Sequence, residues 1–151
     1  MVVDVVVDLD GDGNGDMAAR TMTVRRLQSN HAYGAADTSG MLSFQRLDVY
    51  QRAIEFLVLV NDIVAELPRG NADRADQLVR SAESVVRNIA EGAGRWSEVD
   101  SASRYKIARG EAMECAASLD VMRVRKLVSD ARYARGIQLL EGVVAMLTKM
   151  F

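Results

Sequence analysis

Apolar residues recur every three or four positions over most of residues 41–151, which is the spacing of one face of an α-helix. The pattern predicts four helices, over about residues 43–67 and 72–93, after Ser97, and after Ser129 or Asp130. Four amphipathic helices with short connections are typical of an all-α protein. We therefore expect an antiparallel up-down-up-down four-helix bundle over residues 41–151.

Turn-forming residues separate the predicted helices. Pro68 and Gly70 end the first helix, because proline disfavours a helical residue before it and glycine frees the turn. Gly92 and Gly94 end the second. Ser97 is followed three residues later by a carboxylate, which is the spacing of a capping box at the start of the third helix.

The predicted core takes one apolar stripe from each helix. The four stripes are Leu47, Tyr50, Ile54, Leu57, Val60, Val64 and Leu67; Leu78, Ala82, Val85 and Ile89; Tyr105, Ala108, Ala112, Cys115, Leu119 and Met122; and Tyr133, Ile137, Leu140, Val144, Leu147 and Phe151. Because Cys115 lies on a stripe, we expect a buried, inert thiol and not a nucleophile.

Residues 1–40 follow a different pattern. They are rich in Gly, Asp, Asn, Ser and Thr and have no sustained helical period, which predicts a flexible acidic extension with at most a short strand at residues 2–7. Acidic and amide side chains alternate with glycine there as in a calcium loop, and the candidate ligands are Asp8, Asp10, Asp12, Asn14 and Asp16. Ala19 stands where an EF-hand needs its bidentate acid, so a solvated acidic loop is the competing interpretation.

Composition narrows the class of protein. The net charge is −2, and the excess of acid falls in residues 1–42, so the predicted bundle is nearly neutral and needs a local patch to attract nucleic acid. One cysteine excludes an internal disulfide framework and favours a reducing compartment. No signal peptide opens the chain, and the longest apolar run, residues 56–60, is too short for a bilayer. We expect a cytoplasmic protein without membrane association.

The sequence argues against an enzyme. The sole histidine, His31, lies in the first segment, and no Glu-x-x-His motif of a di-metal bundle occurs. Ser84 lacks a Gly-x-Ser-x-Gly context, and the glycines at 92–94 follow a helix where a dinucleotide site would open one. We expect no catalytic residue, cofactor or small-molecule substrate.

Four polar residues of the second and third helices form a predicted structural network. They are Asn88, Glu91, Arg109 and Glu114. A buried Glu91–Arg109 pair with Asn88 as a further hydrogen-bonding group would fix how the two helices meet, since buried ions persist only when paired. The alternative to this structural role is a catalytic carboxylate with a raised pKa.

Two sets of cations are candidate sites for nucleic acid or another partner. The first spans the turn between the third and fourth helices and comprises Arg123, Arg125, Lys126, Arg132 and Arg135. Arg125 and Lys126 also suit the negative end of a helix dipole, whereas Arg132 and Arg135 lie near an N-terminus, where a cation gains nothing. The second set is Arg80, Arg87 and Arg95, with a solvated face or subunit salt bridges as the alternative.

Three blocks carry a resemblance to a known family. Asn-Ile-Ala-Glu-Gly-Ala-Gly-Arg at 88–95, Ile-Ala-Arg-Gly at 107–110 and the opening Phe44 to Ala53 resemble the bacterial four-helix-bundle proteins of 23S ribosomal RNA intervening sequences. The resemblance covers roughly residues 41–151. It implies a four-helix bundle that assembles as a homo-oligomeric ring, usually a pentamer. It also implies kinship with accessory proteins of diversity-generating retroelements, which bind a reverse transcriptase and nucleic acid through basic surfaces.

This chain departs from the family pattern at two positions. Paired basic residues become Val79-Arg80, and the serine after Ala-Arg-Gly becomes Glu111. Relatives begin near the position of Met41, so residues 1–40 are either an extension or an upstream choice of reading frame. We expect a non-enzymatic oligomeric accessory or scaffold protein that binds RNA, DNA or a protein partner through ring surfaces; the alternative is a purely structural oligomer without nucleic-acid binding.

Overall fold

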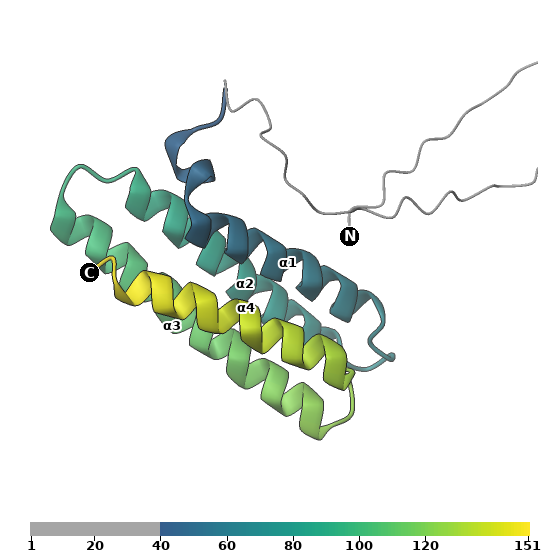
Figure 1. Cartoon of the computed structure of the whole chain (residues 1–151). Coiled ribbons are helices and arrows are strands. Elements are labelled where there is room, and N and C mark those ends of the chain that lie inside the picture. The colour runs from purple at the N-terminus through teal and green to yellow at the C-terminus, as the bar shows by residue number, and fades with distance from the viewer. Residues whose placement is uncertain (1–39) are drawn as a thin grey trace, which may run out of the picture. The chain divides into compact units, whose positions relative to one another are not determined.

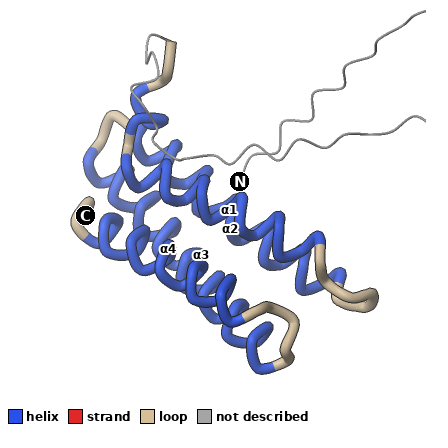
Figure 2. Tube along the Cα trace, turned by 45° about the vertical axis from the view of Figure 1, so that its right-hand side comes forward, coloured by secondary structure: helices blue, strands red, loops and turns tan. Residues whose placement is uncertain are grey.

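The computed structural model describes residues 40–151, which form a short 3₁₀-helix (η1) and four α-helices (Figure 1). Their bounds are Ser43–Arg46 for η1, Asp48–Ala65 for α1, Ala72–Ala93 for α2, Glu98–Val124 for α3 and Asp130–Thr148 for α4. Loops at alternating ends make consecutive helices antiparallel, and each helix packs on two neighbours, α1 also closing on α4 (Figures 1 and 2). The predicted all-α four-helix bundle is confirmed. The predicted strand, His31 and the candidate calcium ligands lie outside the described residues.

The helix boundaries follow local chemistry. Gly70 has a φ of 89°, which a residue with a side chain rarely adopts, so it provides the turn between α1 and α2. The Oγ atoms of Ser97 and Ser129 accept hydrogen bonds from the backbone N–H groups of Asp100 and Arg132, at 3.4 and 3.3 Å. Both serines therefore cap the helices that they precede, as the sequence predicts.

The start of the first predicted helix is wrong. The chain forms η1 over Ser43–Arg46, and Leu47 is extended, with a φ of −70° and a ψ of 128°, before α1 begins at Asp48. Side chains hold this break in place, because Gln51 Nε2 donates to the Gln45 carbonyl at 2.6 Å. Pattern alone missed the break, since Leu47 keeps the apolar spacing even though its backbone leaves the helix.

The residues buried in the core confirm the predicted stripes of α2 and α3 and correct those of α1 and α4. In α2 and α3 every residue of the predicted stripe is buried. In α1 the fully buried residues are Val49, Ala53, Phe56, Val60 and Ile63, and in α4 they are Gly136, Leu139, Leu140, Val143 and Leu147. Of the two predicted stripes, Val60, Leu140 and Leu147 are fully buried, and most of the other predicted residues pack against the core partly buried. Both helices carry apolar residues on neighbouring stripes, so periodicity could not select the line that faces the core. Phe151 lies beyond the end of α4 and is exposed.

Close packing between helices requires two small residues. A Cβ added to Gly92 of α2 would lie 2.5 Å from Cε1 of Tyr105 in α3, and one added to Gly136 of α4 would lie 2.7 Å from Cδ1 of Leu119. The aromatic ring of Tyr105 therefore occupies the space that a side chain at position 92 would need. This contact fixes the separation of α2 and α3 at one end of the bundle.

Candidate interaction surfaces

The outer face of α3 exposes several large apolar residues, although a helix in a bundle normally presents polar residues to solvent. Apolar and small residues lie on the side of the helix opposite its buried stripe. We call this surface the α3 outer face; it consists of Val99, Ser103, Lys106, Gly110, Ala117, Val121 and Val124, with Ile107 and Met113 at its margins. The ammonium group of Lys106 lies 5.5 Å from the centroid of the Phe151 ring. Val99 and Val124 are 78% and 83% exposed, and Met113 and Val121 are about half exposed.

The other three helices show the usual pattern. Their exposed outward positions are charged, polar or alanine: Glu55 and Asp62 on α1, Asp76, Arg80 and Arg87 on α2, and Ala131, Ala134, Gln138, Glu141 and Ala145 on α4. Five of the eight large, exposed hydrophobic residues in the described part of the chain belong to α3. The α3 outer face is therefore a specific feature of this molecule and not a general property of its surface.

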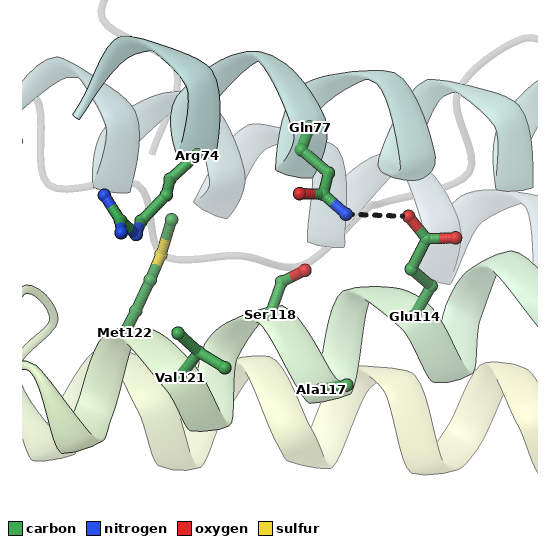
Figure 3. A pocket seen from close by; sticks show the side chains of 7 residues that line it. All are labelled: Arg74, Gln77, Glu114, Ala117, Ser118, Val121 and Met122. Atoms are coloured by element: carbon green, nitrogen blue, oxygen red, sulfur yellow. Dashed lines mark hydrogen bonds between the residues drawn. The ribbon is translucent and has the colours of Figure 1, made fainter.

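A shallow groove of about 270 Å³ runs beside the α3 outer face, between α2 and α3 (Figure 3). Arg74 and Gln77 line it from α2, and Glu114, Ala117, Ser118, Val121 and Met122 line it from α3. Glu114 accepts hydrogen bonds from Gln77 Nε2 at 3.3 Å and from Ser81 Oγ at 2.9 Å. These bonds anchor one end of the groove, while its floor beside Ala117 and Val121 is apolar.

A second hollow, of about 490 Å³, lies where the α2–α3 loop meets the C-terminal residues. It is lined by Arg95, Trp96, Glu98, Val99, Ser101, Ala102, Met150 and Phe151. The Trp96 side chain is fully exposed. This hollow extends the apolar surface of α3 beyond its N-terminal end.

Most of the predicted basic cluster at the α3–α4 turn is paired within the chain. Arg132 forms a two-pronged ion pair with Glu66, and this bond lowers the pKa of Glu66 and raises that of Arg132. Arg135 binds Glu55 at 3.1 Å. Arg123 binds Asp130 at 3.2 Å and stacks over the ring of Tyr133, with 4.4 Å between the guanidinium carbon and the ring centroid.

Arg125 and Lys126 differ from the rest of that cluster. Within residues 40–151 neither forms an ion pair, and both are exposed. Lys126 has a φ of 58°, and the N–H of Leu127 binds the Met122 carbonyl at 2.8 Å, which is a Schellman ending of α3. The predicted five-residue patch is thus reduced to two unpaired cations at this turn.

The second basic set is also partly neutralised. Arg87 binds Glu83 at 2.9 Å, and Arg95 pairs with Glu91. Arg80 donates to the Asp76 carbonyl at 3.3 Å and forms no ion pair with a described residue. The alternative of a solvated, salt-bridged helix face describes these three residues better than a continuous basic strip.

The predicted buried pair between Glu91 and Arg109 is wrong. Glu91 is exposed and binds Arg95 and Arg104, the latter at 3.2 Å. Arg109 lies on the α4 side of α3 and donates to Thr148 Oγ1 at 3.0 Å. Periodicity places a residue on a helix but does not say which neighbour its long side chain meets.

The other two members of the predicted network also bind elsewhere. Asn88 donates to the Ser84 carbonyl of its own helix at 2.9 Å. Glu114 of α3 accepts from Ser81 and Gln77 of α2, so it joins the two helices, as the pair of Glu91 with Arg104 also does. The four residues therefore form separate contacts and not one network.

Neither a nucleophile nor a metal site emerges from the described residues. Cys115 is buried, as predicted, and burial together with Glu111 and Glu114 raises the pKa of its thiol to about 12. Residues 40–151 contain no group of three His, Cys, Asp or Glu side chains that could hold a metal ion. None of the described helices is long and apolar enough to cross a membrane.

The α3 outer face is the feature that the sequence prediction missed. Its signal was present, because Ser103, Gly110, Ala117 and Val124 recur at seven-residue intervals and carry no charge. One apolar stripe per helix is enough to predict the core of a bundle, so the second stripe of α3 was not assigned a role. A second uncharged stripe on the same helix identifies a surface that faces something other than the core.

Comparison with known proteins agrees with this architecture. Residues 45–149 match the family described as 23S rRNA-intervening sequence protein. A crystal structure from Bacteroides thetaiotaomicron, of a protein with unknown function from the S23 ribosomal protein family, has a TM-score of 0.63 and 21% identity; the match covers 68% of this chain and 96% of that chain. No curated protein matches the sequence. Because the family match spans all four α-helices, the chain belongs to the 23S rRNA-intervening sequence protein family.

Proposed function

We propose that this protein is a non-enzymatic scaffold that assembles with copies of itself and binds a macromolecular partner. The observation that carries the proposal is the cluster of large exposed apolar residues on the α3 outer face. Apolar surface gains roughly 25 cal/mol for each Å² removed from water, so a long apolar stripe on a small domain favours association. Ser103, Gly110, Ala117 and Val124, which recur at seven-residue intervals on this face, carry no charge, so covering that line buries no unpaired ion.

A protein partner is better supported than nucleic acid. Arg123, Arg132 and Arg135 already bind carboxylates of the same chain, so nucleic acid would have to displace those carboxylates. Salt bridges that consume cations also reduce the local positive potential that attracts phosphate.

Nucleic-acid binding is the second candidate, and one observation favours it. Arg125 and Lys126 are exposed side by side without a carboxylate partner among the described residues. In an oligomer this pair would be repeated on every subunit, and repeated weak sites add through avidity. The remaining alternative is an oligomer with a purely structural role.

The test is to measure the mass of the full chain by size-exclusion chromatography with light scattering, together with the ratio of absorbance at 260 and 280 nm. We expect an assembly larger than the 16.6 kDa monomer, with the absorbance ratio of protein alone. A Val121→Asp, Val124→Asp variant should shift the mass toward the monomer, whereas Gln138→Asp, on the polar face of α4, should not. A monomer for the unmodified chain at every concentration would contradict the proposal.

The same experiment decides between the partners. An elevated absorbance ratio that falls at high salt indicates bound nucleic acid. In that case Arg125→Glu combined with Lys126→Glu should abolish the excess absorbance. If the double variant retains it, these two cations are not the site.

A further inference from the structure

We infer that the α3 outer face of one copy packs against α1 of the next copy, on the row formed by Ile54, Val58 and Asp62. This inference rests on the self-assembly proposed above and specifies its contact. It commits to one occupant for the α3 outer face, which is the outward side of α1 in a second copy.

Ile54 and Val58 identify that occupant. Both are partly buried, and within residues 40–151 they are the large apolar residues of α1, α2 and α4 that do not pack against the core. They lie one turn apart, so their side chains share one side of α1. A surface that covers the valines of α3 must itself be apolar, because a charged one would be buried unpaired. On the other three helices, Ile54 and Val58 meet that requirement.

The two faces lie on opposite sides of the bundle. α1 and α3 each pack on α2 and α4 and not on one another, so one copy can use both faces at the same time. A contact between two different faces is heterologous, and its repetition closes a ring when each copy is turned relative to the last. A ring is also what the family resemblance implies. Pairing α3 with α3 would instead leave Ile54 and Val58 uncovered.

The contacts around Gly136 show which residues of α1 and α3 lie at the same height. The side chains of Phe56, Leu59 and Leu119 all come within 4 Å of the position that a Cβ on Gly136 would take. Leu119 of α3 is therefore level with the turn of α1 that contains Val58. The two helices run in the same direction with the same rise per residue, so the rest of each helix keeps this register.

A neighbouring copy that is rotated about an axis along the bundles keeps this register, because the rotation moves the chain sideways and neither up nor down. Val58 is then level with Ala117 and Val121 of the neighbour, and Ile54 is level with Met113 and Ala117. The small side chain of Ala117 leaves space between its two larger neighbours for the branched side chains of α1. The contact therefore removes apolar surface of both copies from water.

Charge complementarity supports the same register. Asp62 follows Val58 by one turn on the outward side of α1, and at this height it is level with the segment from Val121 to Arg125. Asp62 and Arg125 are both exposed, and neither forms an ion pair within residues 40–151. The contact brings an unpaired acid of one copy beside an unpaired cation of the next, which favours this arrangement.

Cysteine cross-linking tests this contact directly. Val58→Cys and Ala117→Cys are made in separate full-length chains, which are produced alone and by co-expression, oxidised mildly and resolved without reductant. We expect a cross-linked dimer from the co-expressed chains and little from either chain alone, because each variant adds a thiol to only one side of the contact. Cys115 does not interfere, because it is buried and its thiol stays protonated. Ser103→Cys is the matched control. Position 103 lies on the same face of α3 but roughly 21 Å from position 117 along the helix, so this variant should not cross-link with Val58→Cys.

Each other outcome contradicts the inference in a distinct way. Cross-links within the Ala117→Cys sample alone mean that α3 meets α3 of the second copy. An oligomeric mass with no cross-link from the co-expressed chains means that the chains associate through another surface, so self-assembly stands and the contact between α3 and α1 fails. Equal cross-linking of Val58→Cys with Ser103→Cys means that the register is wrong. A monomeric mass ends both proposals.

A charge exchange gives a second, independent measurement. Arg125→Glu should weaken assembly roughly fivefold, because the ion pair at each contact is replaced by repulsion. Adding Asp62→Arg to the same chain should restore most of the loss, since the pair re-forms with reversed sign. Arg80→Glu, on the exposed side of α2, is the control and should leave assembly unchanged. If the double variant assembles no better than Arg125→Glu alone, Asp62 and Arg125 do not meet across the contact, and the register is wrong.

Discussion

The ionisation state of a side chain in this bundle follows from the groups around it, and Cys115 is the clearest case. It lies in the core of α3, and burial, with Glu111 and Glu114 nearby, raises the pKa of its thiol to about 12. The folded chain therefore keeps the proton at pH values where an unfolded thiol, with a pKa of about 8.5, loses it.

Cys115 should not react with a thiol-specific reagent at about pH 8 until the chain unfolds. The stability that the protonated thiol provides is complete below the unfolded pKa and declines as the pH rises toward the folded value. Reagent uptake with and without denaturant measures the first effect, and a Cys115→Ala variant with a flatter alkaline stability profile checks the second. Rapid labelling of the native protein would contradict the burial.

Lys126 occupies a backbone conformation that normally favours glycine. With a φ of 58° it ends α3, and a left-handed residue with a side chain costs roughly 1–2 kcal/mol. Lys126→Gly should therefore raise the free energy of unfolding by about 1 kcal/mol. Chemical denaturation measures the change. Arg125→Gly is the matched control, because Arg125 has an ordinary helical φ of −82°, and that substitution should stabilise nothing.

At the scale of the helices, Gly92 sets how closely α2 approaches α3. Gly92→Ala places a Cβ against the buried ring of Tyr105 and should destabilise the chain by about 1–3 kcal/mol. Gly94→Ala is the control, because its Cβ would have only ordinary contacts, the nearest at 3.6 Å. Thermal unfolding of the two variants distinguishes a packing effect from a general effect of replacing glycine. Equal melting temperatures of the Gly92→Ala and Gly94→Ala variants would contradict the packing effect.

The ion pair between Glu66 and Arg132 joins the end of α1 to the start of α4. The hydrogen bond from Arg132 lowers the pKa of Glu66 below its usual value. A lowered carboxylate pKa stabilises the fold above the unfolded pKa, and this contribution is lost as the pH falls through the folded one. Titration of the Glu66 carboxyl by NMR should show the lowered pKa, and Arg132→Gln should return it upward. An unchanged titration in that variant would mean that Arg132 is not the cause.

At the scale of the whole molecule, the uneven distribution of polarity among the four helices is the central feature. Five of the eight large exposed hydrophobic residues among residues 40–151 lie on α3. Exposed valines at both ends of α3 add nothing to the stability of a monomer, and the proposed self-assembly rests on this uneven distribution.

The number of helices, their order and most of their ends could be predicted from the sequence. These depend on local properties, namely the spacing of apolar residues, the capping serines at 97 and 129, and Gly70 in the first turn. The core stripes of α2 and α3 could also be predicted, because polar residues flank those stripes. The family followed from the blocks at 88–95 and 107–110.

Which line of α1 and α4 is most deeply buried could not be predicted, because both helices are apolar over a broad arc and the packing of neighbouring helices determines which part of that arc faces the core. The tertiary structure also decided the partners of the long charged side chains. Arg132 reaches Glu66 and Arg109 reaches Thr148, and these pairs are separated by 66 and 39 residues in the sequence. Finally, it showed that the second stripe of α3 points away from the bundle. Helical periodicity determines which residues share one face of a helix. The packing of the helices against each other determines which of those faces stays exposed.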